Sequence, residues 1–185
     1  MAVSQFNLKN GQRAERKLLV TVAEWYESDS TTTTGEPIRE ILGRRTEDSS
    51  IEYNPDIQES TDILGNNYTD VNKTQPSQSF DPFLILGGSK LGAFLNDIRR
   101  RNALSELTGV FTIYIITLFV GAEGAYQAEK HDECTITYDS IGGDANVNFA
   151  ITVHFSNKIT TGTVDKFAED FNFQPDANSL DVTIP

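Results

Sequence analysis

The chain has 185 residues, 38% of them hydrophobic, and a formal net charge of −12. This length is enough for a single domain with a buried core, so we expect residues 1–185 to form one domain. The 27 acidic side chains against 15 basic ones argue against binding of nucleic acid by a basic face. The one cysteine, Cys134, excludes an internal disulfide framework and is typical of a reducing compartment.

The N-terminal part of the chain predicts an arm followed by strands. Residues 1–16 are polar and lack periodicity, so we expect an extended N-terminal arm without the apolar segment of a signal peptide. Lys17–Tyr26 has strand composition and predicts the first core strand. Asp29–Gly35 is a polar, threonine-rich loop, after which Ile38–Arg45 can return as a strand.

The stretch from about residue 50 to 83 predicts one very long β-hairpin. Both arms alternate and are rich in threonine, serine and β-branched residues, and Gly65-Asn66 is typical of a two-residue turn. Pro55 and Pro76 lie at mirror positions about this turn, which predicts a shared point where strand pairing bends or breaks.

This hairpin has few large apolar residues for its length. They are chiefly Ile57, Ile63, Leu64, Tyr68 and Val71. A two-stranded ribbon that long and that polar is not stable alone in water, and identical copies of the chain are its simplest partners. The pattern therefore favours an assembly subunit over an enzyme.

A single helix is expected, at about residues 90–102. Ser89 follows a glycine pair and suits the helix N-cap. One helical stripe then carries the apolar residues that should cover one face of a sheet: Leu91, Phe94, Leu95 and Ile98.

The remainder of the chain is typical of β-structure. Val110–Val120 is apolar on both faces, which suits a strand buried on both sides, and it is too short to span a membrane, so we expect a soluble protein. Further strands are expected at Cys134–Ile141, Ala145–Phe155 and Thr163–Phe173, followed by a polar C-terminal tail at 174–185. The expected inward residues of the last two strands are Val147, Phe149, Ile151, Val153, Phe155, Phe167, Phe171 and Phe173. Together these elements predict a mainly β fold, a two-sheet β-sandwich or barrel with one flanking α-helix.

Signals of catalysis are absent from the sequence. It has no phosphate-binding glycine loop and no paired-histidine zinc motif, and Ser89 is better interpreted as a helix cap than as a nucleophile. The run His131–Cys134 with distant His154 suggests a metal corner, but consecutive residues rarely converge on one ion, so we interpret it as a solvated loop entering a strand. We therefore expect no enzyme activity, no catalytic residues, no cofactor and no metal site.

Two charged groups leave alternatives open. Arg99–Arg101 with Arg44 and Arg45 suggests a nucleic-acid patch, although an exposed helix end or a site for an acidic neighbouring subunit fits so acidic a chain better. The acidic residues of the hairpin either form a solvated face that protects an edge, or line a channel once copies assemble. Cys134 and Trp25 are expected in the core.

Five short segments of the chain together match one known family. They are Thr61-Asp-Ile-Leu-Gly65, Tyr68-Thr-Asp-Val-Asn-Lys73, Phe80-Asp-Pro-Phe83, Gly87-Gly-Ser-Lys-Leu91 and Gly162-Thr-Val-Asp-Lys166. These segments resemble the tail tube (major tail) proteins of phages and phage-like particles of Gram-positive hosts. They occur in the family's order and extend the resemblance from about residue 17 to 173. The resemblance implies hexameric rings that stack into a hollow tube, with inner sheets of the subunits closing into one barrel.

The resemblance implies a structural subunit that conducts DNA during ejection without binding it specifically. Its partners would be further copies of itself, tape-measure, tail terminator and baseplate or tip proteins, and a sheath if the tail contracts. Its place would be the virion tail, assembled in the host cytoplasm, with no membrane binding by this chain. An inner tube protein of a DNA-free contractile particle or secretion-type system is the alternative, and a monomeric carbohydrate- or protein-binding β-sandwich is a third.

Alternation along the hairpin assigns its residues to two faces. Lumen-lining candidates share one face, and the opposite face carries isoleucines fit to pack against the core, although a bulge near Pro55 could invert this register. The lumen candidates are Asp56, Gln58, Ser60 and Asp62. The residues expected to join subunits are Ile57, Ile63, Leu64, Gly65, Asn66, Tyr68 and Val71.

Overall fold

The computed structural model describes residues 6–26, 36–44, 46, 49–166 and 168–176. The expectations for Thr31–Thr34, Phe167 and the tail beyond residue 176 lie outside this range. The described chain is mainly β, with 51% strand and 12% helical residues and one α-helix, as the sequence predicts. Of the expected arm, Phe6 forms an isolated bridge to Val120.

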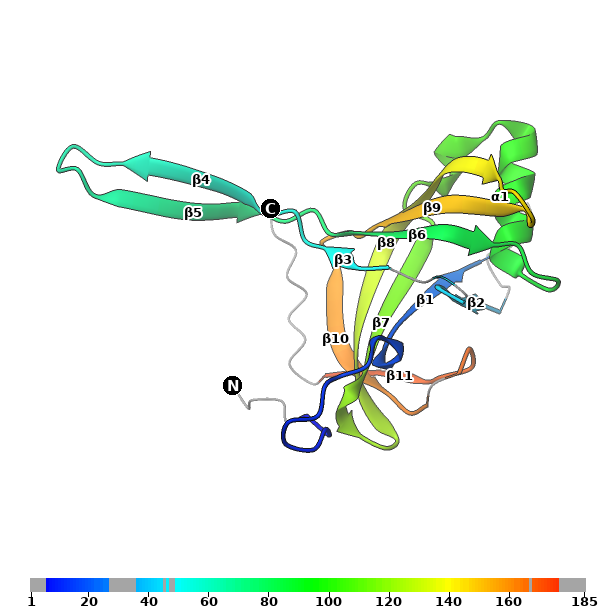
Figure 1. Ribbon diagram of the computed structural model, residues 1–185, viewed down its shortest axis with the longest axis horizontal. Coiled ribbons are helices and arrows are strands. Elements are labelled where there is room, and N and C mark those ends of the chain that lie inside the picture. The colour runs from blue at the N-terminus through cyan, green and yellow to red at the C-terminus, as the bar shows by residue number, and fades with distance from the viewer. Residues whose placement is uncertain (1–5, 27–35, 45, 47–48, 167, 177–185) are drawn as a thin grey trace.

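The strands and the helix follow one another along the chain as drawn in Figure 1. They are β1 (Leu19–Trp25), β2 (Ile38–Ile41), β3 (Ile51–Glu52), β4 (Asp56–Thr61), β5 (Asn67–Lys73), β6 (Ser77–Leu84), α1 (Lys90–Arg101), β7 (Phe111–Ala122), β8 (Ala125–Gly142), β9 (Asn148–His154), β10 (Ile159–Val164) and β11 (Phe173–Pro175). Short 3₁₀ turns occur at Arg16–Leu18 and Leu104–Leu107.

One continuous antiparallel sheet forms both layers of the body, in the order β2-β1-β7-β8-β9-β6-β3, with β10 and β11 attached beside β8. Strand β8 belongs to both layers, because its first half pairs with β7 and β10 and its second half pairs with β9. A bulge separates the halves: Cys134 pairs with Phe111 and His131 with Ile113, and Glu133 between them has φ 57°. The expected strand at Cys134–Ile141 is therefore the second half of a longer strand, and the interpretation of residues 131–134 as a solvated loop is wrong.

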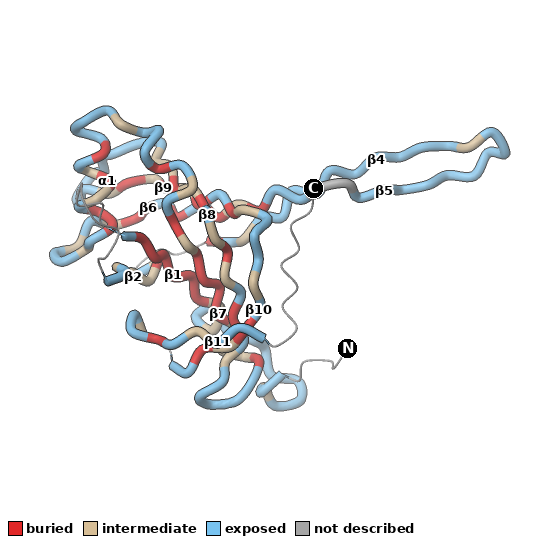
Figure 2. The backbone as a smooth tube through the Cα atoms, turned by 180° about the vertical axis from the view of Figure 1, so that it is seen from behind, coloured by how far each residue is buried: buried red, intermediate tan, exposed pale blue. Residues whose placement is uncertain are grey.

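Apolar residues are buried on both faces of β7, as its sequence predicts. Phe111, Ile113 and Ile115 face the main core, which both layers and α1 enclose. Tyr114 and Ile116 face a second, smaller cluster with Val164 and Phe171, which β10 and the segment before β11 supply. Figure 2 shows this burial concentrated in β1, β7 and β8.

The helix α1 begins and ends where the sequence predicts. Ser89 Oγ accepts a hydrogen bond from Gly92 N at 3.0 Å, and the Glu40 carboxylate of β2 accepts from Leu91 N at 2.8 Å. Leu91, Leu95 and Ile98 are fully buried. Phe94 is only partly buried, because it lies at the rim of the core with its ring centroid 6.1 Å from those of Trp25 and Phe111.

The C-terminal strands differ from the expected ones in two places. Val147 is 57% exposed rather than inward, because it lies in the turn before β9. The expected strand at Thr163–Phe173 is wrong, since β10 ends at Val164 and a loop follows, closed by Asp165 Oδ1 accepting from Asn172 N at 2.8 Å. Phe171 and Phe173 nevertheless come to one place, 4.8 and 5.6 Å from the ring of Tyr114.

Within the described residues, no helix has both the length and the apolar character needed to cross a membrane.

Candidate functional site

The hairpin of β4 and β5 forms a sheet of its own that projects from the body (Figure 1). Its strands pair from Asp56–Lys73 to Thr61–Asn67. The pairing of β3 with β6 ends at Glu52–Ser77, so the ladder is interrupted at Pro55 and Pro76, as the sequence predicts. This interruption separates a projecting ribbon from the part of the hairpin that belongs to the body.

The end of the ribbon is a loop of residues 62–66, and the predicted two-residue turn at Gly65-Asn66 is wrong. Asp62 N donates to Asn66 O, and Gly65 N donates to Asp62 O, both at 3.0 Å. Gly65 has φ 83°, which a side chain would disfavour. The loop is longer than expected because the Asp62 side chain supplies part of its hydrogen bonding.

The Asp62 carboxylate organises this loop. Oδ1 accepts from Leu64 N at 2.8 Å and Asn66 N at 2.9 Å. Oδ2 accepts from Asn66 Nδ2 and Tyr68 Oη, both at 3.0 Å. These hydrogen bonds, first of all those from Asn66, lower the pKa of Asp62 from 3.8 to about 2. The loop therefore carries a fixed negative charge at neutral pH.

Both faces of the ribbon are exposed to solvent. Ile57 pairs with Val71 on one face, and Ser60 pairs with Tyr68 on the other. The expectation that Ile57 and Ile63 pack against the core is wrong within one chain, since Ile57 is 54% exposed and Ile63 fully exposed. The reason is geometric, because the ribbon extends away from the sheet and no other described element covers it (Figure 2).

The apolar residues expected to join subunits are all available on this ribbon. Leu64 is 81% exposed and Val71 62%, with Tyr68 also half-exposed. Gly65 and Asn66 lie with them in the loop. Large apolar side chains exposed on an isolated two-stranded ribbon are typical of a surface that a partner covers.

The lumen candidates divide between the ribbon and its loop. Asp56, Gln58 and Ser60 alternate along β4 on the face opposite Ile57, and the bulge expected near Pro55 occurs between Asp56 and Ile57. Asp62 belongs to the loop, where its oxygens are already occupied. Their role as a channel lining stays a prediction.

The residues considered for metal binding lie apart. His131 is buried in β8, with Nε2 3.5 Å from the carboxylate of Glu129. His154 belongs to β9, where its Nε2 lies 3.1 Å from Thr137 Oγ1. Cys134 is a core residue, as the sequence predicts, and burial raises its pKa to about 11. The described part of the chain contains no group of three or more metal-ligating side chains.

Of the arginines proposed as one patch, Arg45 lies outside the described residues, and the others lie at opposite ends of α1. Arg44 forms an ion pair with Glu169 at 2.9 Å and lines a pocket with residues 86–90, at the start of the helix. Arg99–Arg101 form the last turn, where Arg101 pairs with Asp97 and Glu106 at 2.8 Å. Because the helix separates the groups by about 18 Å, they do not form a single nucleic-acid patch.

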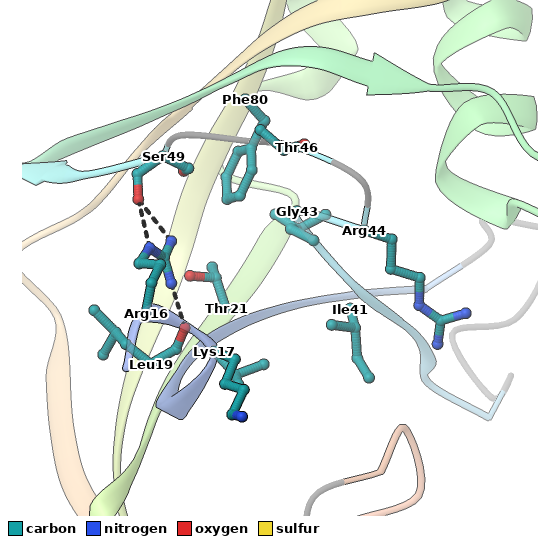
Figure 3. Close-up of a pocket in the computed structure, with 12 residues that line it drawn as sticks. Arg16, Lys17, Leu19, Thr21, Ile41, Gly43, Arg44, Thr46, Ser49 and Phe80 are labelled. Carbon is teal, nitrogen blue, oxygen red and sulfur yellow. Dashed lines mark hydrogen bonds between the residues drawn. The ribbon is translucent and has the colours of Figure 1, made fainter. Parts of the chain in front are cut away.

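A pocket that the sequence did not indicate lies at the seam between the two ends of the sheet (Figure 3). We call it the seam pocket. Its volume is about 290 Å³. Its lining residues are Arg16, Lys17, Leu19, Val20, Thr21, Ile41, Leu42, Gly43, Arg44, Thr46, Ser49 and Phe80.

Side chains, rather than strand pairing, hold this seam together. Thr21 Oγ1 of β1 donates to Gln78 Oε1 of β6 at 2.9 Å, and Gln78 Nε2 donates to Ser49 Oγ at 3.1 Å. All three side chains are buried. In the sequence, Gln78 could have indicated this seam. It lies two residues before Phe80 in β6, so both side chains point inward, and a buried amide needs hydrogen-bond partners.

Arg16 lies at one wall of the seam pocket, where no described residue is its counterion. Its Nε and Nη2 donate to Ser49 O at 3.0 and 2.6 Å, and Nη1 donates to Leu19 O. All these acceptors are neutral carbonyls, and among the described residues Arg16 forms no ion pair. The described part of the pocket therefore combines apolar walls with the positive charge of Arg16.

Comparison with known protein families and with curated proteins found no match. No family model matches the sequence, and no curated protein matches it either.

Proposed function

We propose that this chain is a structural subunit of a phage tail tube, in which copies assemble into rings that stack around a channel for DNA. The subunit is not an enzyme. It binds neighbouring subunits and lines the channel through which DNA moves.

The projecting ribbon is the observation that carries this proposal. It exposes Ile57, Ile63 and Leu64, with Tyr68 and Val71, far from the core of its own chain. A ribbon of this kind gains stability only from a partner, and most soluble oligomers are built from identical copies. The resemblance of five segments to tail tube proteins is the reason for proposing rings that stack into a tube.

Charge supports a role as a wall for DNA. With a net charge of −12, the subunit repels phosphate instead of retaining it. The face of β4 with Asp56, Gln58 and Ser60 is polar and suits a water-filled channel.

Deletion of Ile57–Thr74 tests the proposal. The body should remain folded, because no described side chain of this ribbon is buried. The deletion variant should be a monomer or small oligomer by size-exclusion chromatography, and should form no tubes in negative-stain electron microscopy, while the full chain forms them. Circular dichroism and thermal unfolding verify the fold.

Val147→Ser is the matched control, since Val147 is an exposed apolar residue outside the ribbon. This variant should assemble like the full chain. Tubes of normal diameter from the deletion variant would refute the role of the ribbon.

A further inference from the structure

We propose that the seam pocket of one subunit receives the hairpin loop, residues 62–66, of a second copy of this chain. Ile63 and Leu64 enter the apolar part of the pocket, and Arg16 faces the acidic side of the ribbon. This inference rests on the proposed function and names the surface that the projecting ribbon contacts.

The apolar surfaces match in kind. Ile63 and Leu64 are the most exposed large apolar side chains of the described chain. The seam pocket presents aliphatic and aromatic walls, among them Leu19, Ile41 and Phe80. Its volume of about 290 Å³ is several times the share of one water molecule, about 30 Å³. Docking would remove apolar surface from water on both partners.

The charges of the two surfaces are opposite. Asp62 lies in the loop, and Glu59 lies on β4 behind it, on the face opposite the channel candidates. The described residues of the pocket lining include Arg16, Lys17 and Arg44 and no acidic side chain. Lys17 and Arg44 pair with Glu15 and Glu169, but these exposed pairs hold their partners weakly.

Arg16 is the cation best placed to meet an acidic partner. Its contacts to Ser49 O and Leu19 O fix the guanidinium without neutralising it. A guanidinium has five N–H donors, so each terminal nitrogen has a second N–H that no described residue accepts. A carboxylate of the neighbouring ribbon accepts from these groups in a charge-assisted hydrogen bond.

The loop cannot reach the pocket of its own chain. Ser49 lines the pocket and lies just before β3, at the base of the hairpin. From Glu52 to Asp62 the ribbon extends roughly 30 Å away from this base, and Figure 1 shows it pointing away from the body. A contact between two different surfaces of the same chain is heterologous, so repetition produces a ring or a filament.

Cross-linking tests the contact in the full-length chain. Cys134 is buried with a raised pKa, so introduced thiols react without competition. Leu64→Cys and Lys17→Cys, prepared separately and mixed, should form a dimer with a short bis-maleimide. Leu64→Cys mixed with Val147→Cys is the control and should give at least roughly tenfold less dimer.

A second variant measures the energetic part of the contact. Leu64→Asp should raise the concentration needed for assembly by about tenfold or more, because burial of a leucine contributes roughly 1.5–3 kcal/mol. Val147→Asp should leave it unchanged.

The outcomes separate this inference from the proposed function. Normal tubes with no excess of dimer in the Leu64–Lys17 mixture, or with Leu64→Asp assembling normally, overturn the docking site and leave the tube subunit standing. If the unaltered chain forms no tubes and the Leu64–Lys17 mixture gives no cross-linked dimer, both the docking site and the proposed function are overturned.

Discussion

Asp62 illustrates how one side chain sets the shape of an exposed loop. Its carboxylate accepts hydrogen bonds from Leu64 N, Asn66 N, Asn66 Nδ2 and Tyr68 Oη. Alternation along the sequence predicted that this side chain points into water and lines a channel. In the structure it instead accepts hydrogen bonds from the loop, as aspartate side chains commonly do in turns. Replacement of Asp62 would therefore alter the loop as well as the charge.

The loop should lose order in acid. A carboxyl whose pKa is lowered on folding stabilises the folded form above its unfolded value, and this contribution is lost as the pH falls through the folded value. For Asp62 the window lies between the ordinary 3.8 and about 2. NMR titration of its carboxyl carbon should give a midpoint near 2, with the amides of Leu64 and Asn66 shifting in the same step.

Tyr68→Phe is the control for this titration. It removes one donor to Asp62, so the midpoint should move upward while the rest of the loop is retained. A midpoint at the ordinary value in the unaltered chain would contradict the hydrogen-bonded loop.

Cys134 should be inert in the folded protein. Burial raises its pKa to about 11, so the thiol is protonated at neutral pH and shielded from reagents. A colorimetric thiol reagent should react slowly with the native chain and rapidly, with one equivalent, in denaturant. Rapid labelling of the native chain at pH 7 would place this residue outside the core.

At the scale of elements, α1 shows that sequence periodicity predicts where a helix lies better than it predicts how deeply each side chain is buried. The stripe and the Ser89 cap were enough to place the helix, because both are local signals. The partial exposure of Phe94 depends on where the helix meets Trp25 and Phe111, which no spacing within the helix records.

The helix offers a graded test of core packing. Leu95→Ala should destabilise the protein by about 2–5 kcal/mol, because the fully buried side chain leaves a cavity. Phe94→Ala should cost less, since that ring is partly exposed. Denaturant unfolding measures both, with exposed Lys90→Ala as the control, expected within about 0.5 kcal/mol of the unaltered chain. Equal losses at Phe94 and Leu95 would contradict this ranking.

Strand β8 is the element that sequence patterning missed. Its first half is polar, so the sequence suggested a loop at residues 131–134. Pairing with β7 on one side and β10 on the other makes it a central strand nevertheless. The bulge at Glu133 then carries the same strand into the second layer.

At the scale of the whole molecule, the two faces of the ribbon allow a matched test of the channel. Asp56 and Glu59 lie on opposite faces of β4 and are both exposed. Asp56→Lys should leave tubes intact and slow DNA ejection, most strongly at low salt, because basic rings contact phosphate. Glu59→Lys makes the same charge change on the other face and should leave ejection unaffected if tubes form.

Ejection and infection efficiency of particles carrying each variant measure this difference. Equal ejection by both variants, with tubes of normal shape, would show that the face with Asp56 does not line the channel.

Local patterns in the sequence determined the fold class, the helix with its cap, the buried strand at 110–120 and the hairpin with its interruption at Pro55 and Pro76. Each depends on residues close together in the chain, where periodicity and turn chemistry act directly. Only the tertiary structure decided that β8 serves both layers, that the ribbon leaves its own core, and that Arg16, Gln78 and Phe80 meet at the seam pocket. These features arise from pairing and packing between distant segments, and side-chain spacing along one strand carries no information about which strand will lie beside it.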